Sequence, residues 1–300
     1  MSAPASRSGG PPPGGDASTR GHPSPGEPVR PDGQDLLRAP RAGALYSGNA
    51  RAVFARGMSA QWRANWAVMA SGFVEPVLFL LAMGVGLGAL VGEVTGPDGA
   101  PVSYAAYIAP ALLAVSAMNG AVYDSTWNVF FKLRYARLYE GMLSTSLGPL
   151  DVALGEIGVA VVRGGAYAAG FTAVMAVMGL VDSWWAVLMV PGAVLVAFGF
   201  AALGMAVTSF MRTFQQMDWV TFLTLPLFLF SGTFYPLDVY PEPIRWIVQA
   251  LPLWHGVELL RDLAGGGPDL GTAGHAGYYL VMVAGGVFVT TARLRALFLR

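Results

Sequence analysis

Four charged residues stand inside long apolar stretches of the sequence: Glu75, Asp124, Glu156 and Arg163. Ionisable groups are unfavourable in an apolar environment, so each needs a partner or a function. Glu156 and Arg163 are seven residues apart, which places them on one face of a helix but about 10 Å apart along its axis. Each is therefore expected to meet a partner from another segment, and Glu75 and Asp124 are the candidates for Arg163. Structural ion pairs are the favoured interpretation, and a proton relay in a secondary transporter is the alternative.

Motifs for nucleotide, metal or covalent chemistry are missing from the sequence. The single lysine, Lys132, follows two phenylalanines and not the glycine-rich loop that cradles phosphates. The three histidines, His22, His255 and His275, do not form a metal-binding pair at helical spacing. Cysteine is absent, which excludes disulfides and thiol catalysis. We therefore expect a chain that is not an enzyme and binds no cofactor, although a membrane enzyme acting on lipid-linked glycans stays a further alternative.

The composition indicates a membrane protein. Hydrophobic residues make up 54% of the 300 residues and charged residues only 12%, whereas soluble domains carry about 25% charged residues. Too little charge is left to cover a surface that faces water, and the mean hydropathy of +0.52 agrees. The formal net charge is zero, so no overall field attracts nucleic acid.

Two regions differ sharply in composition. Residues 1–45 are rich in Pro, Gly and Ser and are predicted to be a disordered cytoplasmic tail. Residues 46–300 are predicted to be the transmembrane domain. At its start, residues 50–64 combine apolar side chains at four-residue spacing with arginines on the opposite side. This pattern is typical of an amphipathic helix that lies in a membrane interface.

Long apolar runs predict an all-α integral membrane protein with six transmembrane helices, since a bilayer core needs about 20 apolar residues per helix. The predicted spans lie near residues 66–91, 104–127, 153–180, 184–210, 219–235 and 277–292.

The distribution of basic residues predicts the orientation. With a cytoplasmic N-terminus, the loops 92–102 and 181–183 lie outside and contain no Lys or Arg, and the segment 236–276 contains only Arg245 and Arg261. Apart from Arg163 inside the third predicted span, the other basic residues beyond the tail fall on the inner side, as the positive-inside rule requires. Both termini are therefore predicted to be cytoplasmic, in agreement with an even number of spans.

The outer segment 236–276 is too long and too apolar for a plain loop. It contains Pro236 and Pro252 beside two amphipathic stretches, Ile244–Leu251 and Val257–Leu263. Long connections usually carry structure of their own, so we expect two short helices that re-enter or cap the outer leaflet.

The inner segment between the second and third predicted spans, Lys132–Asp151, is predicted to form a short helix that ends before Gly148-Pro149. A short helix held on the inner face is a natural contact for a partner protein, and a mere connector is the simpler interpretation.

The chain resembles the membrane permeases of type-2 ABC exporters. Within that group it is similar to the nodulation-factor (lipo-oligosaccharide) export permease subgroup and, more distantly, to the daunorubicin export permease. The motifs that carry the resemblance follow one another in order and span about residues 50–265: Val74-Glu75-Pro76, Gly84-Val85-Gly86-Leu87-Gly88, Ser116-Ala117-Met118-Asn119, Glu140-Gly141-Met142-Leu143-Ser144-Thr145, Ser231-Gly232-Thr233-Phe234-Tyr235-Pro236 and Leu251-Pro252-Leu253.

The resemblance implies a permease of a bacterial inner membrane that moves a lipid-like, glycolipid or drug substrate outward. It implies a permease homodimer and two copies of an ABC ATPase subunit, which holds the ATP and Mg. A cytoplasmic coupling helix would dock on the ATPase through Arg137, Glu140, Met142, Leu143 and Ser144. The outer re-entrant segment would include Pro236, Pro252, His255 and Arg261.

Overall fold

The computed structural model describes residues 46–63, 74, 76–96, 99–181, 183–265 and 267–298. The predicted tail and Glu75 lie outside the described residues. Within the described part, four helical stretches are long and apolar enough to cross a membrane: Tyr104–Tyr135, Pro149–Val177, Trp184–Phe210 and Leu270–Phe298. At 1.5 Å per residue, each stretch exceeds the roughly 30 Å of a bilayer core.

These stretches form the body of the protein. The first consists of α4 (Tyr104–Tyr123) with the π-helical turns η3 (Asp124–Asn128) and η4 (Phe131–Tyr135). The others are α6 (Pro149–Val177), α7 (Met189–Phe210) after the turn η5 (Trp184–Leu188), and α11 (Leu270–Phe298). Helix α11 extends beyond the predicted span 277–292 at both ends. It begins early because the Asp269 carboxylate accepts the Thr272 N–H at 2.7 Å and thereby caps the first turn.

Small residues let the helices of the body approach closely. A Cβ placed on Gly164 in α6 would lie 2.6 Å from the Ala197 side chain in α7. A Cβ on Gly286 in α11 would lie 2.6 Å from the backbone of Ala202, also in α7. The sequence therefore has glycine where the helix backbones leave no room for a side chain.

Within the first and fifth predicted spans, the helices that the structure describes are shorter than those of the body. Residues Pro76–Val91 form an apolar helical stretch that contains the π-helix η2 (Leu80–Leu87) and α3 (Gly88–Val91). The fifth predicted span is occupied by α8 (Asp218–Phe230), which follows the turn η6 (Phe214–Met217), and none of the 13 residues of α8 is buried. The count of six spans therefore stays a prediction.

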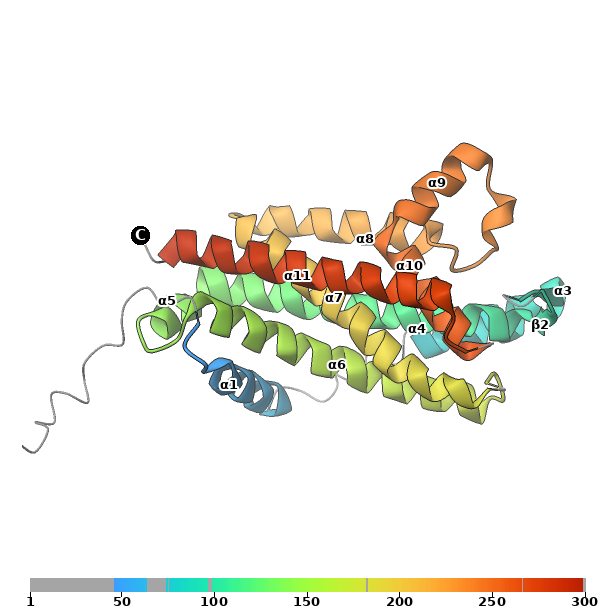
Figure 1. Cartoon of the computed structure of the whole chain (residues 1–300), viewed down its shortest axis with the longest axis horizontal. Helices are drawn as coiled ribbons and strands as arrows, with labels where there is room; N and C mark the ends of the chain where they lie inside the picture. Colours follow the sequence, from blue (N-terminus) through green and yellow to red (C-terminus); the bar gives the residue numbers. More distant parts are fainter. Residues whose placement is uncertain are drawn as a thin grey trace, which may run out of the picture. The chain divides into compact units, whose positions relative to one another are not determined.

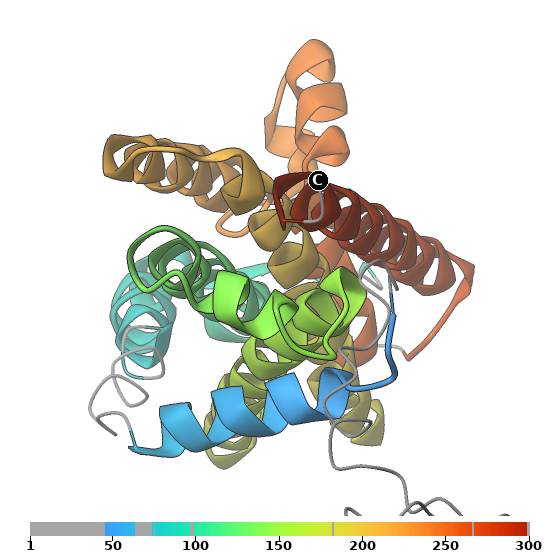
Figure 2. The ribbon, with the colours of Figure 1, turned by 90° about the vertical axis from the view of Figure 1, so that its left-hand side faces the viewer.

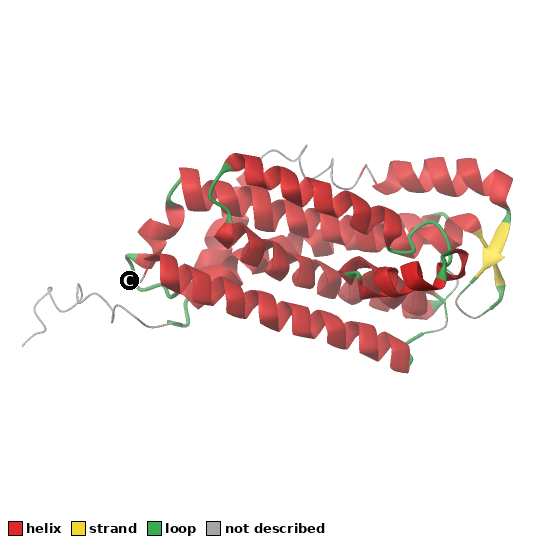
Figure 3. Cartoon of the chain, turned by 90° about the horizontal axis from the view of Figure 1, so that it is seen from above, coloured by secondary structure: helices red, strands yellow, loops and turns green. Residues whose placement is uncertain are grey.

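Shorter elements occupy the two ends of the helical body (Figures 1 and 3). One end, which we call the basic end, carries α1 (Ala50–Arg63), α5 (Leu138–Leu143) and the last turns of α11. The other, the hairpin end, carries η7 (Leu237–Val239), α9 (Glu242–Ala250), α10 (Pro252–Ala264) and the strands β1 (Glu93–Thr95) and β2 (Pro101–Ser103). The strands pair antiparallel with Val94 opposite Val102. The described chain is otherwise helical, in agreement with the predicted all-α integral membrane protein. The hairpin itself was not predicted, because three-residue strands leave no clear alternation in the sequence.

Candidate functional site

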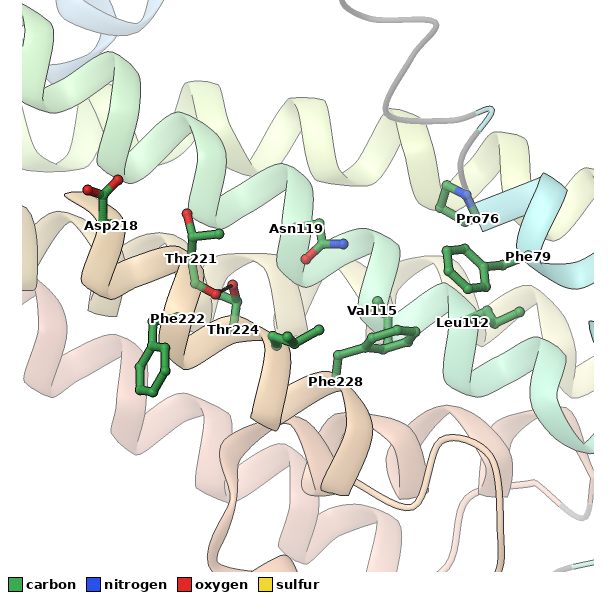
Figure 4. Close-up of a pocket in the computed structure, with 11 residues that line it drawn as sticks. Pro76, Phe79, Leu112, Val115, Asn119, Asp218, Thr221, Phe222, Thr224 and Phe228 are labelled. Carbon is green, nitrogen blue, oxygen red and sulfur yellow. Dashed lines mark hydrogen bonds between the residues drawn. The ribbon is translucent and has the colours of Figure 1, made fainter.

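A cavity of about 690 Å³ lies between the Pro76–Val91 stretch, α4 and α8 (Figure 4). Its polar side chains lie toward the basic end, where Phe222 also lines it, and the side chains toward the hairpin end are aromatic and aliphatic (Figure 4). The lining residues are Pro76, Phe79, Leu112, Val115, Asn119, Asp218, Thr221, Phe222, Thr224, Leu225 and Phe228. Such a graded lining suits a molecule that has a polar part and an apolar part.

Asn119 is placed in this cavity by the packing of α4. From Tyr107 to Gly120 every residue of the helix is buried except Asn119, which is exposed and faces the cavity (Figure 4). Thr221 and Thr224 are three residues apart on α8 and line the opposite wall. Residues at this spacing share one face of a helix, so the two helices present hydroxyl and amide groups to the same space.

A second cavity, of about 600 Å³, follows toward the hairpin end. Phe79 and Phe228 line both cavities, and their rings meet edge to face with centroids 5.8 Å apart. The remaining lining residues are Met83, Leu87, Val91, Val94, Tyr104, Leu229, Phe234, Tyr235 and Pro236. The two cavities therefore lie in series along the body, with an aromatic pair between them.

The predicted intramembrane charges form two separate clusters. Arg163 on α6 meets Asp124 at the end of α4, with Nε to Oδ2 at 2.8 Å, and both side chains are at least 93% buried. Asn128 donates an amide hydrogen bond to Asp124 at 2.5 Å. Of the two candidates for Arg163, the structure shows Asp124 as the partner.

Glu156 forms the second cluster, at the basic end. Its buried carboxylate lies 2.5 Å from the Lys132 ammonium group and 3.5 Å from the Arg56 guanidinium group. Tyr139 of α5 is fully buried beside it. Burial raises the pKa of the Tyr139 phenol well above its usual value, and the neighbouring Glu156 carboxylate raises it further. Glu156 thus joins α1, α5, α6 and the end of the α4 stretch.

Asp151 ties α1 to the same end of α6. Its carboxylate accepts backbone N–H groups from Ser47 at 2.8 Å, Asn49 at 2.9 Å and Gly148 at 2.9 Å. The first two precede α1 and the third precedes α6, so one buried carboxylate caps the start of both segments. Figure 2 shows α1 lying across this end of the body.

The predicted coupling residues are only partly available to a partner. Arg137, Glu140 and Ser144 are exposed, and Leu143 is half-buried. Met142 is 8% exposed and packs into the core beside Tyr139, and its role as a direct contact stays a prediction. Helical periodicity explains the difference, since Tyr139 and Met142 share the inner face of α5. Arg137 precedes the helix with a left-handed backbone conformation, φ 45°.

The predicted outer residues are distributed around the hairpin end. Pro236 lines the second cavity, and the Pro252 carbonyl accepts the Tyr279 hydroxyl at 2.8 Å. The Nδ1 atoms of His255 and His275 are 2.8 Å apart, so one ring donates to the other. Burial, together with the neighbouring His275, lowers the pKa of His255 to about 4.

The motifs found in the sequence include Pro76 and Asn119 of the first cavity, and Leu87, Phe234, Tyr235 and Pro236 of the second. They do not include the threonines of α8 or the phenylalanine pair. The signal that was available is the pair Thr221 and Thr224, two hydroxyl residues at helical spacing in an apolar segment. Phe79 and Phe228 carry no such signal, because single phenylalanines are common in apolar helices.

Comparison with known proteins defines the class of this chain. The family model of the ABC-2 type transporter matches residues 49–264. The chain is 32% identical to Nodulation protein J of Rhizobium leguminosarum bv. trifolii over 83% of this chain and 94% of the relative. It is 31% identical to the bv. viciae protein over 83% and 95%, and 28% identical to that of Rhizobium meliloti (strain 1021) over 79% and 92%.

The chain belongs to the ABC-2 type transporter family and is a multi-pass membrane subunit of a transporter. The predicted resemblance to the nodulation-factor subgroup is supported by these relatives, whereas the more distant resemblance to the daunorubicin permease stays a prediction.

Proposed function

We propose that the chain is the permease of an ATP-driven exporter that moves an amphiphile of the glycolipid class outward across a bacterial inner membrane. The observation that carries the proposal is the pair of cavities in series. The polar wall at Asn119, Thr221 and Thr224 suits a sugar headgroup, and Phe79 and Phe228 suit an acyl chain. The Nodulation protein J relatives favour a lipo-oligosaccharide over a drug.

The energy would come from a separate ABC ATPase subunit in two copies, since the sequence has no phosphate-binding loop of its own. The exposed edge of α5, with Glu140 and Ser144, is the proposed docking surface. Movement of α5 would be passed on through buried Tyr139 to Glu156, and so to α1 and α6. ATP-driven closure of the two ATPase subunits then shifts the permease between inward-open and outward-open states, because the closed ATPase subunits bind one of these states more tightly than the other.

We further propose six spans, cytoplasmic termini and pairing with a second copy of this chain. The exposed apolar side chains of α8, among them Trp219, Phe222 and Leu223, support the pairing because nothing in the described chain covers them. A copy seated there would close the open side of the first cavity. Disulfide formation between single cysteines placed at Leu223 of both copies tests this, because the chain has no cysteine of its own.

Transport by purified protein tests the function. The permease is reconstituted in proteoliposomes with a candidate ABC ATPase subunit that co-purifies with it, and export of a fluorescent lipo-oligosaccharide is followed. Export should require ATP and stop when the ATPase is inactivated by mutation. Export that survives this inactivation and collapses with a proton uncoupler would instead establish a secondary transporter.

Asn119→Leu tests the cavity itself. The change removes the exposed amide from the polar wall and should raise the KM for the lipo-oligosaccharide about tenfold. A tenfold change corresponds to about 1.4 kcal/mol, which is the contribution expected of one hydrogen bond to the substrate. Gln249→Leu is the matched control, because Gln249 lies on α9 and lines neither cavity. Equal KM values for both variants would remove Asn119 from the substrate path.

A further inference from the structure

Arg261 is a buried cation on α10 that contacts two other segments near the hairpin end as well as Glu258 of its own helix. It is 5% exposed. Its Nη2 donates to the Gly232 carbonyl at 2.6 Å, and its Nη1 donates to the Glu258 carboxylate at 2.9 Å. Its guanidinium carbon lies 4.0 Å from the centre of the Tyr107 ring of α4. One side chain thus connects α10, α4 and the turn that follows α8.

That turn, Ser231–Tyr235, forms the wall of the second cavity. Gly232 has φ +69°, a conformation that favours glycine, and it turns its carbonyl toward Arg261. Phe234 and Tyr235, which follow directly, line the cavity, and the Tyr104 hydroxyl donates to the Phe234 carbonyl at 3.3 Å. The position of the wall therefore depends on where the Gly232 carbonyl is held.

Arginine suits this position better than any other residue. Its guanidinium stays charged when buried, offers several donors in one plane and stacks on an aromatic ring at the same time. Lysine has the charge but cannot bond Gly232 and Glu258 in one plane while it covers the Tyr107 ring.

We propose that Arg261 is the positioning residue of the second cavity: it holds the wall at Ser231–Tyr235 and thereby controls the release of cargo at the hairpin end. The part that concerns cargo rests on the proposed function. The part that concerns the wall rests on the contacts of Arg261 alone, so the two can fail separately.

A single cysteine at Thr233 reports on the wall. The chain has no native cysteine, Thr233 is fully buried, and its hydroxyl has no hydrogen-bond partner among the described residues. Thr233→Cys is therefore a mild change. In the full-length permease–ATPase complex, Arg261→Gln should raise the rate of labelling by a water-soluble maleimide at least tenfold, and Arg261→Lys should give an intermediate rate.

Arg245→Gln is the matched control. Arg245 is an arginine of the same end, on α9, but it is 38% exposed and lies 3.6 Å from an exposed Asp238. This variant should leave the labelling rate unchanged. A labelling rate in Arg261→Gln that equals the control overturns the proposal, whether or not the complex exports any substrate.

Kinetics separate positioning from a general loss of structure. In Arg261→Gln the maximal export rate should fall at least tenfold, while the KM for the fluorescent lipo-oligosaccharide and the basal ATP hydrolysis stay within twofold. A variant that labels faster but exports at the normal rate overturns the role in release and leaves the wall contact standing. Parallel loss of basal ATP hydrolysis and of a monodisperse complex would show that Arg261 only supports the fold, which also overturns the proposal.

Discussion

The Asp124–Arg163 pair gives the sharpest prediction about the membrane-embedded charges. Arg163→Met replaces the cation with an uncharged side chain of similar length. Both side chains of the pair are at least 93% buried. Loss of one partner of a buried ion pair leaves the other charge without its counter-charge and destabilises by about 3–5 kcal/mol. Asp124 keeps the Asn128 amide at 2.5 Å, which places the expected loss at the lower end, about 3 kcal/mol.

The matched comparison is Glu156→Gln. Its cations, Lys132 and Arg56, have side chains that are 25% and 41% exposed, so water can solvate them when the carboxylate is gone. The expected loss in the free energy of unfolding is about 1–2 kcal/mol, which lies between the losses typical of exposed and of buried ion pairs.

A double variant, Asp124→Asn with Arg163→Met, removes both buried charges. It should recover at least half of the stability lost in Arg163→Met, because no uncompensated charge remains. Free energies of unfolding are measured in mixed micelles by titration with a denaturing detergent. A loss below about 1 kcal/mol in Arg163→Met, or no recovery in the double variant, would refute the structural interpretation of the pair.

The same variants test the proton relay. If the pair is structural, the double variant should retain ATP-dependent export in proteoliposomes. A double variant that is as stable as the parent but inactive in transport would favour a relay through Asp124 and Arg163.

Three further predictions concern other parts of the chain. Glu140 is exposed, so Glu140→Arg should reduce co-purification of the ATPase without loss of permease yield. Met142 is buried, so Met142→Asp should lower the permease yield itself. Equal permease yields for the two variants would contradict this distinction. Gly155→Val should release α1 from α6, since a Cβ there would lie 2.5 Å from the Val53 Cβ; limited proteolysis between residues 46 and 63 should then accelerate, and an unchanged rate would argue against this packing. The pKa of His255 is lowered to about 4, so as the pH falls the unfolded chain binds a proton before the folded chain does. The contact between α10 and α11 should therefore be intact above about pH 6.5 and weaken toward pH 4. Trp254 fluorescence should report this change, and His255→Phe should abolish it.

Much of the fold followed from patterns that act locally. The apolar runs at 104–127, 153–180 and 184–210 correspond to three of the stretches able to cross a membrane, because hydropathy and length are properties of a single segment. The ends of α11 were missed, since its first turns include Gly271, Gly274 and His275 and are set by the cap at Asp269.

The sequence by itself determined that this chain lies in a membrane, lacks a phosphate-binding loop and must pair its embedded charges. Only the tertiary structure decided which partners meet. Arg163 could have met Glu75 or Asp124, and Arg261 lies 29 residues from the Gly232 carbonyl that it holds. Such contacts depend on how helices distant in sequence pack, and the glycines that permit close packing do not reveal which helix they face. The cavity between α4 and α8 has the same origin, because its polar wall is shared by residues about 100 positions apart in the chain.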